Sequence, residues 1–147
     1  MVGSLIYLTN TRPDIAYSVG KVARYMTTPR QTHWIAAKRI LRYIKGTLDN
    51  GIWYTRTGTG TGKGTGTDIG TGTGLTGYTD ADWAGSLEDR KSTTGYVFHL
   101  GSGAVSWCSK KKHTIALSLI ELEYRATSTA VKEVIWLRKI LEDLHYK

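Results

Sequence analysis

Two carboxylates lie close together in the stretch from Gly77 to Gly85, which reads Gly-Tyr-Thr-Asp-Ala-Asp-Trp-Ala-Gly. This stretch is predicted to be a β-strand, although Asp is depleted in strands. Because side chains alternate between the two faces of a strand, Tyr78, Asp80 and Asp82 would share one face. Mg²⁺ prefers hard oxygen ligands such as carboxylates and the phosphates of a substrate. The pattern therefore indicates a candidate magnesium site; the alternative is that Asp82 caps the strand end and Asp80 is solvated.

Two more acids stand at the start of the last predicted helix. Ser118 and Glu121 have the spacing of a capping box, in which both side chains bond to backbone amides at the helix start. Glu121 therefore has a structural role. Since a helix turns by about 100° per residue, Glu123 falls on the apolar face, and we expect its carboxylate to point toward the sheet. A buried acid without a partner is costly, so Glu123 is a candidate to converge with Asp80.

The signals ahead of these strands predict helices, and the whole pattern predicts an α+β fold. One helix starts at Thr11-Arg12-Pro13-Asp14 and ends at Thr28-Pro29, and a second runs from His33 to Lys45 with Thr32 as its cap. The run from Leu5 to Leu8 is long enough for a helical turn. The candidate acids therefore follow an N-terminal helical region.

The turns after this region predict a three-stranded antiparallel sheet. The Gly77 to Gly85 strand is followed by a charged turn, a strand from Thr93 to Leu100, a Gly101-Ser102-Gly103 turn and a strand from Ala104 to Cys108. Ile52-Trp53-Tyr54 would form a further short strand. The last helix would pack across the sheet through one apolar face, which consists of Leu119, Leu122, Ala126, Ala130, Val134, Leu137, Leu141 and Leu144.

The composition limits the class of protein. A chain of 147 residues, of which 40% are hydrophobic, suits one domain or one small domain with an appendage. The Thr-Gly repeat at residues 57–74 cannot build a core, because glycine occupies nearly every second position; we expect a loop there. Cys108 is the single cysteine, which excludes a disulfide framework. No apolar run approaches the length of a membrane span.

The charge favours an anionic partner, since the formal net charge is +8. The predicted second helix has a basic face made of Lys38, Arg39, Arg42 and Lys45. A basic loop, Lys110-Lys111-Lys112, follows the last strand. Such residues contact the phosphates of nucleic acid; the alternative is that the helix face is a solvated surface.

Several motifs together resemble the Pol polyprotein of copia-type LTR retrotransposons. They are Thr11-Arg12-Pro13-Asp14-Ile15-Ala16-Tyr17, Leu41-Arg42-Tyr43-Ile44-Lys45-Gly46-Thr47, Asp80-Ala81-Asp82-Trp83-Ala84-Gly85, Asp89-Arg90-Lys91-Ser92-Thr93-Thr94-Gly95-Tyr96 and Glu121-Leu122-Glu123-Tyr124. The resemblance implies that residues 1–50 are the helical end of a reverse transcriptase region. Residues 51–147 would then be the N-terminal part of an RNase H-like domain, truncated after its long helix and carrying the Thr-Gly insert at 57–74.

The resemblance also implies a chemistry, because RNase H domains cleave the RNA strand of an RNA–DNA hybrid with two Mg²⁺ ions. Asp80 would be the first-strand acid and Glu123 the helix acid, with Asp82 and Glu121 as further candidates in the same motifs. The family uses at least one more Asp, on a strand beyond this helix. We therefore expect remnants of a metal site, no efficient nuclease, hybrid or other nucleic-acid binding, and an intracellular location in cytoplasm or nucleus.

A second resemblance concerns Arg39-Ile40-Leu41-Arg42, which fits the Arg-x-Leu-Arg motif of secreted oomycete effectors. It implies an alternative function: a protein that is secreted, enters a plant host cell, meets host plant proteins and suppresses defence or cell death. Against this, no clear signal peptide precedes the motif, and we expect Ile40 and Leu41 to be needed for packing of the second helix. The pattern of four residues with one free position is short.

Overall fold

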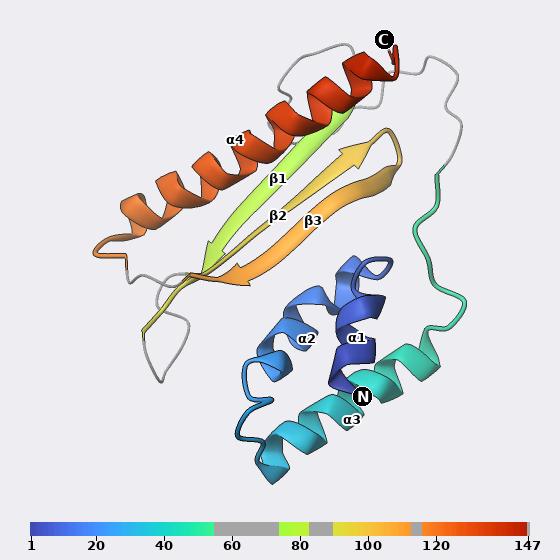
Figure 1. The fold of residues 1–147 in the computed structure, drawn as a ribbon, viewed down its shortest axis with the longest axis vertical. Helices are drawn as coiled ribbons and strands as arrows, with labels where there is room; N and C mark the ends of the chain where they lie inside the picture. Colours follow the sequence, from blue (N-terminus) through green and yellow to red (C-terminus); the bar gives the residue numbers. More distant parts are fainter. Residues whose placement is uncertain (55–73, 83–89, 113–115, 147) are drawn as a thin grey trace. The chain divides into compact units, whose positions relative to one another are not determined.

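The computed structural model describes residues 1–54, 74–82, 90–112 and 116–146. The chain divides into two compact units, an N-terminal unit, Met1–Ile52, and a C-terminal unit, Trp53–Lys147. Figure 1 shows the helices and strands of each unit, and each unit has its own hydrophobic cluster. The predicted Thr-Gly loop at 57–74 lies outside the described residues, apart from Gly74.

The N-terminal unit is helical, as the sequence predicts. It contains α1 (Val2–Leu8), the short 3-10 helix η1 (Pro13–Ile15), α2 (Ala16–Ala23) and α3 (Gln31–Gly46). The buried side chains of its core come from all four helices and are Leu5, Ile15, Val19 and Ile40. Because every helix contributes apolar side chains to one cluster, packing rather than intrinsic helix propensity holds these short helices in place.

The helix boundaries differ from the predicted ones in two places. The first predicted helix ends at Ala23, well before Thr28-Pro29, and Met26, which the periodicity places on its apolar face, is 52% exposed. Thr32 is not the cap of α3, because that helix already begins at Gln31. The backbone N–H of Arg30 donates instead to His33 Nδ1 at 3.0 Å, so a histidine ring closes this helix start.

A buried arginine links the start of η1 to the end of α3. Arg12 donates to both carboxylate oxygens of Asp14, at 3.0 and 2.7 Å, and to Thr47 O and Oγ1, at 3.1 and 2.7 Å. Tyr43 donates its hydroxyl to Asp14 Oδ2 at 2.9 Å. The hydrogen bond from Arg12 is the main cause of the lowered pKa of Asp14. The pair thus stabilises the fold above the ordinary Asp pKa, and its contribution is lost as the pH falls through the lowered pKa.

The C-terminal unit confirms the predicted antiparallel sheet with a long helix across it. β1 (Leu75–Asp82), β2 (Thr93–Leu100) and β3 (Gly103–Lys111) pair in the order β1-β2-β3, and α4 (Leu119–Asp143) lies across one face (Figure 1). Leu75 pairs with Leu100 and Asp82 with Thr93. The fold class α+β is therefore correct, and the RNase H-like assignment within it stays a prediction.

The predicted short strand at Ile52-Trp53-Tyr54 is wrong, because these residues are not part of the sheet. Tyr54 is attached through its side chain: its hydroxyl donates to Ala104 O at 2.7 Å. Its ring lies so close to Gly103 that a Cβ added there would clash with Tyr54 Cδ1. The segment therefore has the residue types of a strand, but it is held by a side-chain contact and not by a ladder of backbone hydrogen bonds.

The inward face of α4 is shorter than the periodicity predicts. Its buried residues are Leu122, Ala126, Ala130, Val134 and Leu141. Leu119 and Leu144, at the two ends of the predicted stripe, are 46% and 70% exposed. The helix therefore extends past its packing surface at both ends. Among the described residues, none of the helices has the length and apolar content needed to cross a bilayer.

Candidate functional site

The two aspartates of β1 lie on the face of the sheet opposite to α4. Leu75 is buried in one cluster with Ala130 and Val134 of α4, so it marks the helix-facing side of the strand. Strand alternation then places Asp80 and Asp82 on the other side. Both aspartates are exposed, which agrees with this placement.

Gly77 fixes the orientation of β1 by making room for an aromatic ring. It pairs with Phe98 across the strands, and a Cβ at Gly77 would clash with the ring atom Phe98 Cε1. Phe98 is only 4% exposed and belongs to the cluster under α4. A one-residue slip of β1 would replace this glycine by a larger side chain beneath Phe98. The side of β1 that carries Asp80 is thus determined by packing on the opposite side.

Aromatic and aliphatic side chains share the aspartates' face of the sheet. Tyr78 pairs with Val97, and Val97 pairs with Trp107. The Tyr78 ring also meets His99 edge-on, with ring centroids 6.0 Å apart. The prediction that Tyr78, Asp80 and Asp82 share one face follows from this register. Asp80 itself pairs with Gly95, so its cross-strand neighbour has no side chain, and the rings lie around Tyr78, two residues before it.

Ser118 caps α4 as predicted, but the reciprocal bond of the predicted capping box differs, because the Glu121 carboxylate accepts from Leu117 instead of from Ser118. The backbone N–H of Glu121 donates to Ser118 Oγ at 3.1 Å, and Glu121 Oε2 accepts from the backbone N–H of Leu117 at 2.8 Å. Its other oxygen forms an ion pair with Arg125, at 2.6 Å. Both oxygens of this carboxylate are thus used by the helix start, which leaves Glu121 little capacity to hold a metal ion.

Glu123 is exposed, so the expectation of a buried carboxylate directed at the sheet is wrong. Its angular position on α4 is inward, but the adjacent inward residue Leu119 is also exposed. Leu122, by contrast, is 1% exposed, so the packing surface reaches the first turns of α4 but does not cover Glu123. The C-terminal end of β1 and the start of α4 do lie at the same end of the sheet (Figure 1), but the strand acids and α4 are on opposite faces.

The described carboxylates do not form the set of ligands that a two-metal site requires. Asp80 and Asp82 share a strand face, while Glu123 belongs to the element that packs on the other face. Among residues 1–54, 74–82, 90–112 and 116–146, no group of three or more His, Cys, Asp or Glu side chains is placed to hold a metal ion. Glu88 and Asp89 lie outside the described residues. The assignment of Asp80 and Glu123 as metal ligands stays a prediction.

The basic face of α3 carries apolar side chains that the charge pattern did not predict. Lys38, Arg42 and Lys45 are exposed, and Lys38 Nζ lies 5.1 Å from the centroid of the Trp34 ring. Together with Ile35 and Leu41, Lys38 and Arg42 line a shallow cavity of about 360 Å³. The presence of Trp34 four residues before Lys38 is the signal that would have revealed this mixed surface.

The four residues of the Arg-x-Leu-Arg motif do not all point to the same side of α3. Ile40 is buried in the core, at 8% exposed, whereas Leu41 is 40% exposed; the expectation that Leu41 is a core residue is wrong. Arg39 lines a pocket against α2, and Arg42 lines the shallow cavity with Ile35. A helix separates consecutive residues by about 100°, so Ile40 and Leu41 point in different directions, whereas Arg39 and Arg42, three residues apart, are neighbours on the helix surface.

The predicted basic loop is largely the end of a strand. β3 continues to Lys111, and Lys112 Nζ donates to Thr129 Oγ1 of α4 at 3.2 Å. Lys110 is exposed and pairs with Thr94 on β2. Lys112 therefore has a structural contact with the helix, and Lys110 is the member of the run that is best placed to meet a partner.

A polar cluster between the sheet and α4 was not predicted from the sequence. Ser106 Oγ donates to Glu133 Oε1 at 2.7 Å, and Tyr96 lies in the same region. Burial, and then the charge of Glu133, raise the pKa of Tyr96. Glu133 is the inward-facing acid of α4, and its hydrogen bond from Ser106 fixes the helix to β3. The sequence signal for this polar cluster is the alternation of polar and apolar residues on β3.

Similarity to known sequences over nearly the whole chain defines a class of protein: the chain belongs to the family of copia-type retrotransposon Pol sequences. It is 44% identical over 144 residues to the retrovirus-related Pol polyprotein from transposon TNT 1-94 of Nicotiana tabacum, and the match covers 97% of this chain and 10% of that protein. It is 40% identical over 144 residues to the Pol polyprotein from transposon RE2 of Arabidopsis thaliana, with 98% and 9% coverage. The chain thus spans about a tenth of these polyproteins.

A relative with a different description has a length closer to that of this chain. The chain is 47% identical over 137 residues to secreted RxLR effector protein 161 of Plasmopara viticola, with 92% of this chain and 87% of that protein covered. No protein-family model matches the chain, and no solved structure matches it.

The different environments of Glu121 and Glu123 lead to a test of the helix start. Glu121→Ala should lower the free energy of unfolding by about 0.5–1.5 kcal/mol, because it removes a cap and a partly exposed ion pair. Glu123→Ala, the matched control, should change it by less than about 0.5 kcal/mol, as at other exposed positions. Both changes alter helix propensity alike, so urea denaturation of the two variants isolates the cap. A larger loss for Glu123→Ala would mean that this carboxylate has a partner.

Proposed function

We propose that this chain is a retrotransposon-derived, RNase H-like fragment that binds nucleic acid without cleaving it. The observation that carries the proposal is the 40–44% identity to plant Pol polyproteins over nearly the whole chain. The physical support for binding is the net charge of +8 and the exposed cations of α3. Such a fragment would act inside the cell that carries it, in cytoplasm or nucleus.

The α3 surface fits nucleic acid better than a purely charged surface would. Lys38, Arg42 and Lys45 supply exposed cations for phosphates. Trp34 is 45% exposed, beneath the Lys38 ammonium group, and a half-exposed ring offers a stacking surface for an unpaired base. An RNA–DNA hybrid or a single strand is the class of partner that this combination would recognise.

The absence of cleavage is proposed from the positions of the acids. Two Mg²⁺ ions held about 4 Å apart require several carboxylates on one surface. In the described residues this chain offers Asp80 and Asp82 on one face, Glu121 occupied as a cap, and Glu123 on an element that packs on the other face. No reaction step through Mg²⁺ follows from this arrangement.

Incubation with a labelled RNA–DNA hybrid tests the proposal about cleavage. In Mg²⁺ or Mn²⁺ the chain should release no more fragments than a buffer control, because the acids do not converge. Asp80→Asn is the matched variant, since it keeps the size of the side chain and removes its charge. Cleavage by the chain that disappears in Asp80→Asn would make Asp80 catalytic and the protein an enzyme.

Fluorescence anisotropy of the same hybrid tests binding. Affinity should fall steeply with salt. Replacing Lys38, Arg42 and Lys45 together by Gln should reduce the slope of log affinity against log salt by roughly 0.9 for each phosphate that is no longer neutralised, up to about 3 in all. The control replaces Lys132 and Lys139, two exposed cations of α4, and should leave the slope nearly unchanged. A flat salt response, or no binding at low salt, would remove nucleic acid as a partner.

A second proposed function, that of a secreted effector, is favoured by one specific observation. This chain matches a relative named as a secreted RxLR effector, and the match covers 87% of that relative. In this function the chain would be secreted, enter a plant cell and act on host proteins. Arg39 and Arg42 are both exposed, and because they are three residues apart on a helix they are surface neighbours that one partner could contact together.

Expression in leaf tissue tests the effector function. The chain should then suppress induced cell death, while an unrelated basic protein of similar size should not. Arg39→Ala combined with Arg42→Ala should cost no more than about 0–1 kcal/mol per exposed charge, so disappearance of the phenotype would reflect a missing interaction with a partner rather than unfolding. Absence of suppression, with the protein shown to accumulate, would reduce the Arg-x-Leu-Arg match to a property of an amphipathic basic helix.

A further inference from the structure

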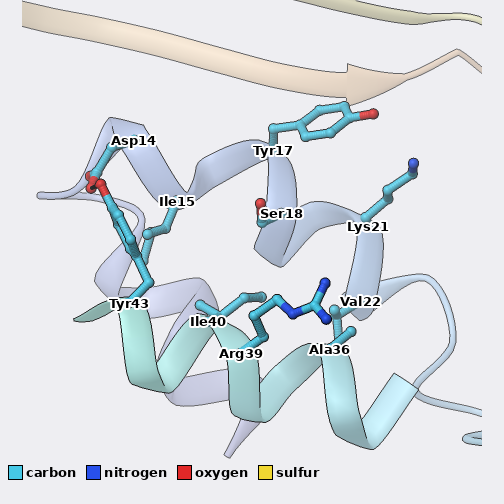
Figure 2. Close-up of a pocket in the computed structure, with 10 residues that line it drawn as sticks. All are labelled: Asp14, Ile15, Tyr17, Ser18, Lys21, Val22, Ala36, Arg39, Ile40 and Tyr43. Atoms are coloured by element: carbon cyan, nitrogen blue, oxygen red, sulfur yellow. Dashed lines mark hydrogen bonds between the residues drawn. The ribbon is translucent and has the colours of Figure 1, made fainter. Parts of the chain in front are cut away.

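A cavity of the N-terminal unit lies between α2 and α3. The α2–α3 pocket has a volume of about 470 Å³, which is within the range of small-molecule sites in proteins. Ile15, Val22, Ala36 and Ile40 give it apolar walls, and Tyr17 and Tyr43 contribute rings (Figure 2). A pocket of this size and lining fits the flat apolar body of a small molecule.

Two cations line the same pocket from facing elements, Lys21 from α2 and Arg39 from α3. Neither forms an ion pair with any carboxylate in the part of the chain that the structure describes. Lys21 Nζ instead lies 5.4 Å from the centroid of the Tyr17 ring. In Figure 2 the Arg39 guanidinium extends to the Val22 end of the pocket, away from Asp14 and Tyr43.

The acid that lines the pocket does not compensate these cations. Both oxygens of Asp14 accept hydrogen bonds from Arg12, and Oδ2 also accepts one from Tyr43. Its charge is therefore balanced by a guanidinium that does not line the pocket. The pocket is left with the Arg39 guanidinium at its Val22 end and with apolar walls between this end and Tyr43, while the Lys21 ammonium group lies beside the Tyr17 ring at the rim (Figure 2).

We propose that the α2–α3 pocket binds a small amphipathic anion: an aromatic or aliphatic body with one carboxylate, sulfonate or phosphate group. The anionic group would lie between Lys21 and Arg39, and the apolar body would lie over Ile15 and Ile40. The charge-assisted hydrogen bonds of a guanidinium with an oxyanion provide the orientation, and burial of the body provides most of the affinity. This site does not depend on nucleic-acid binding, which is proposed for Lys38, Arg42 and Lys45.

The probe for this site is 1-anilinonaphthalene-8-sulfonate, an apolar anion, added to the unchanged chain. Methyl NMR resonances of Ile15, Val22 and Ile40 should shift in a saturable way. The neutral analogue N-phenyl-1-naphthylamine has the same rings without the sulfonate and should bind at least 10-fold more weakly. Lys21→Gln combined with Arg39→Gln should raise the dissociation constant of the sulfonate about 10-fold and leave that of the neutral analogue unchanged.

Two further variants keep the result interpretable. Ala36→Leu fills the pocket without adding a polar group and should abolish the shifts. Lys132→Gln, at an exposed cation of α4, is the control and should bind like the unchanged chain. Equal binding of the charged and neutral probes would overturn the proposal. Shifts confined to α4 residues, or a dissociation constant unaffected by the variants at Lys21, Arg39 and Ala36, would also overturn it.

Discussion

The alternation of side chains along β1 is the constraint on which the C-terminal unit depends. Leu75 and Gly77 must face α4, because the first fills the core and the second leaves room for the Phe98 ring. Because successive side chains of a strand point to opposite faces, the orientation of Leu75 and Gly77 requires Asp80 to face away from the helix. The packing requirement thus outweighs any preference of the acids for one another, since a register slip would expose the whole apolar set.

The N-terminal unit depends on the buried Arg12. A guanidinium has five donors in a fixed plane, and here four hydrogen bonds join Asp14 to Thr47 at the end of α3. The same contacts neutralise the acid beside the α2–α3 pocket and leave Lys21 and Arg39 without a carboxylate partner among the described residues. One structural ion pair therefore determines both the closure of the unit and the sign of charge in its pocket.

The relatives of this chain include both a Pol polyprotein and a protein named as a secreted effector. Ile40 is required by the core, while Arg39, Leu41 and Arg42 are at the surface. Packing therefore accounts for Ile40, and the other three residues of the Arg-x-Leu-Arg pattern are accessible to a partner.

Local periodicity and spacing were enough to predict the helices, the antiparallel sheet, the cap at Ser118 and the shared face of Tyr78, Asp80 and Asp82. They did not predict the exposure of Glu123 or Leu41. Glu123 has an inward angular position on its helix, and Leu41 is apolar. Whether such a residue is buried depends on where the surface that packs against the helix ends. Periodicity along one helix carries no information about that surface. The placement of the strand acids and α4 on opposite faces, and of Lys21 and Arg39 in one pocket, emerged only from the three-dimensional packing, since both facts depend on which elements lie against each other.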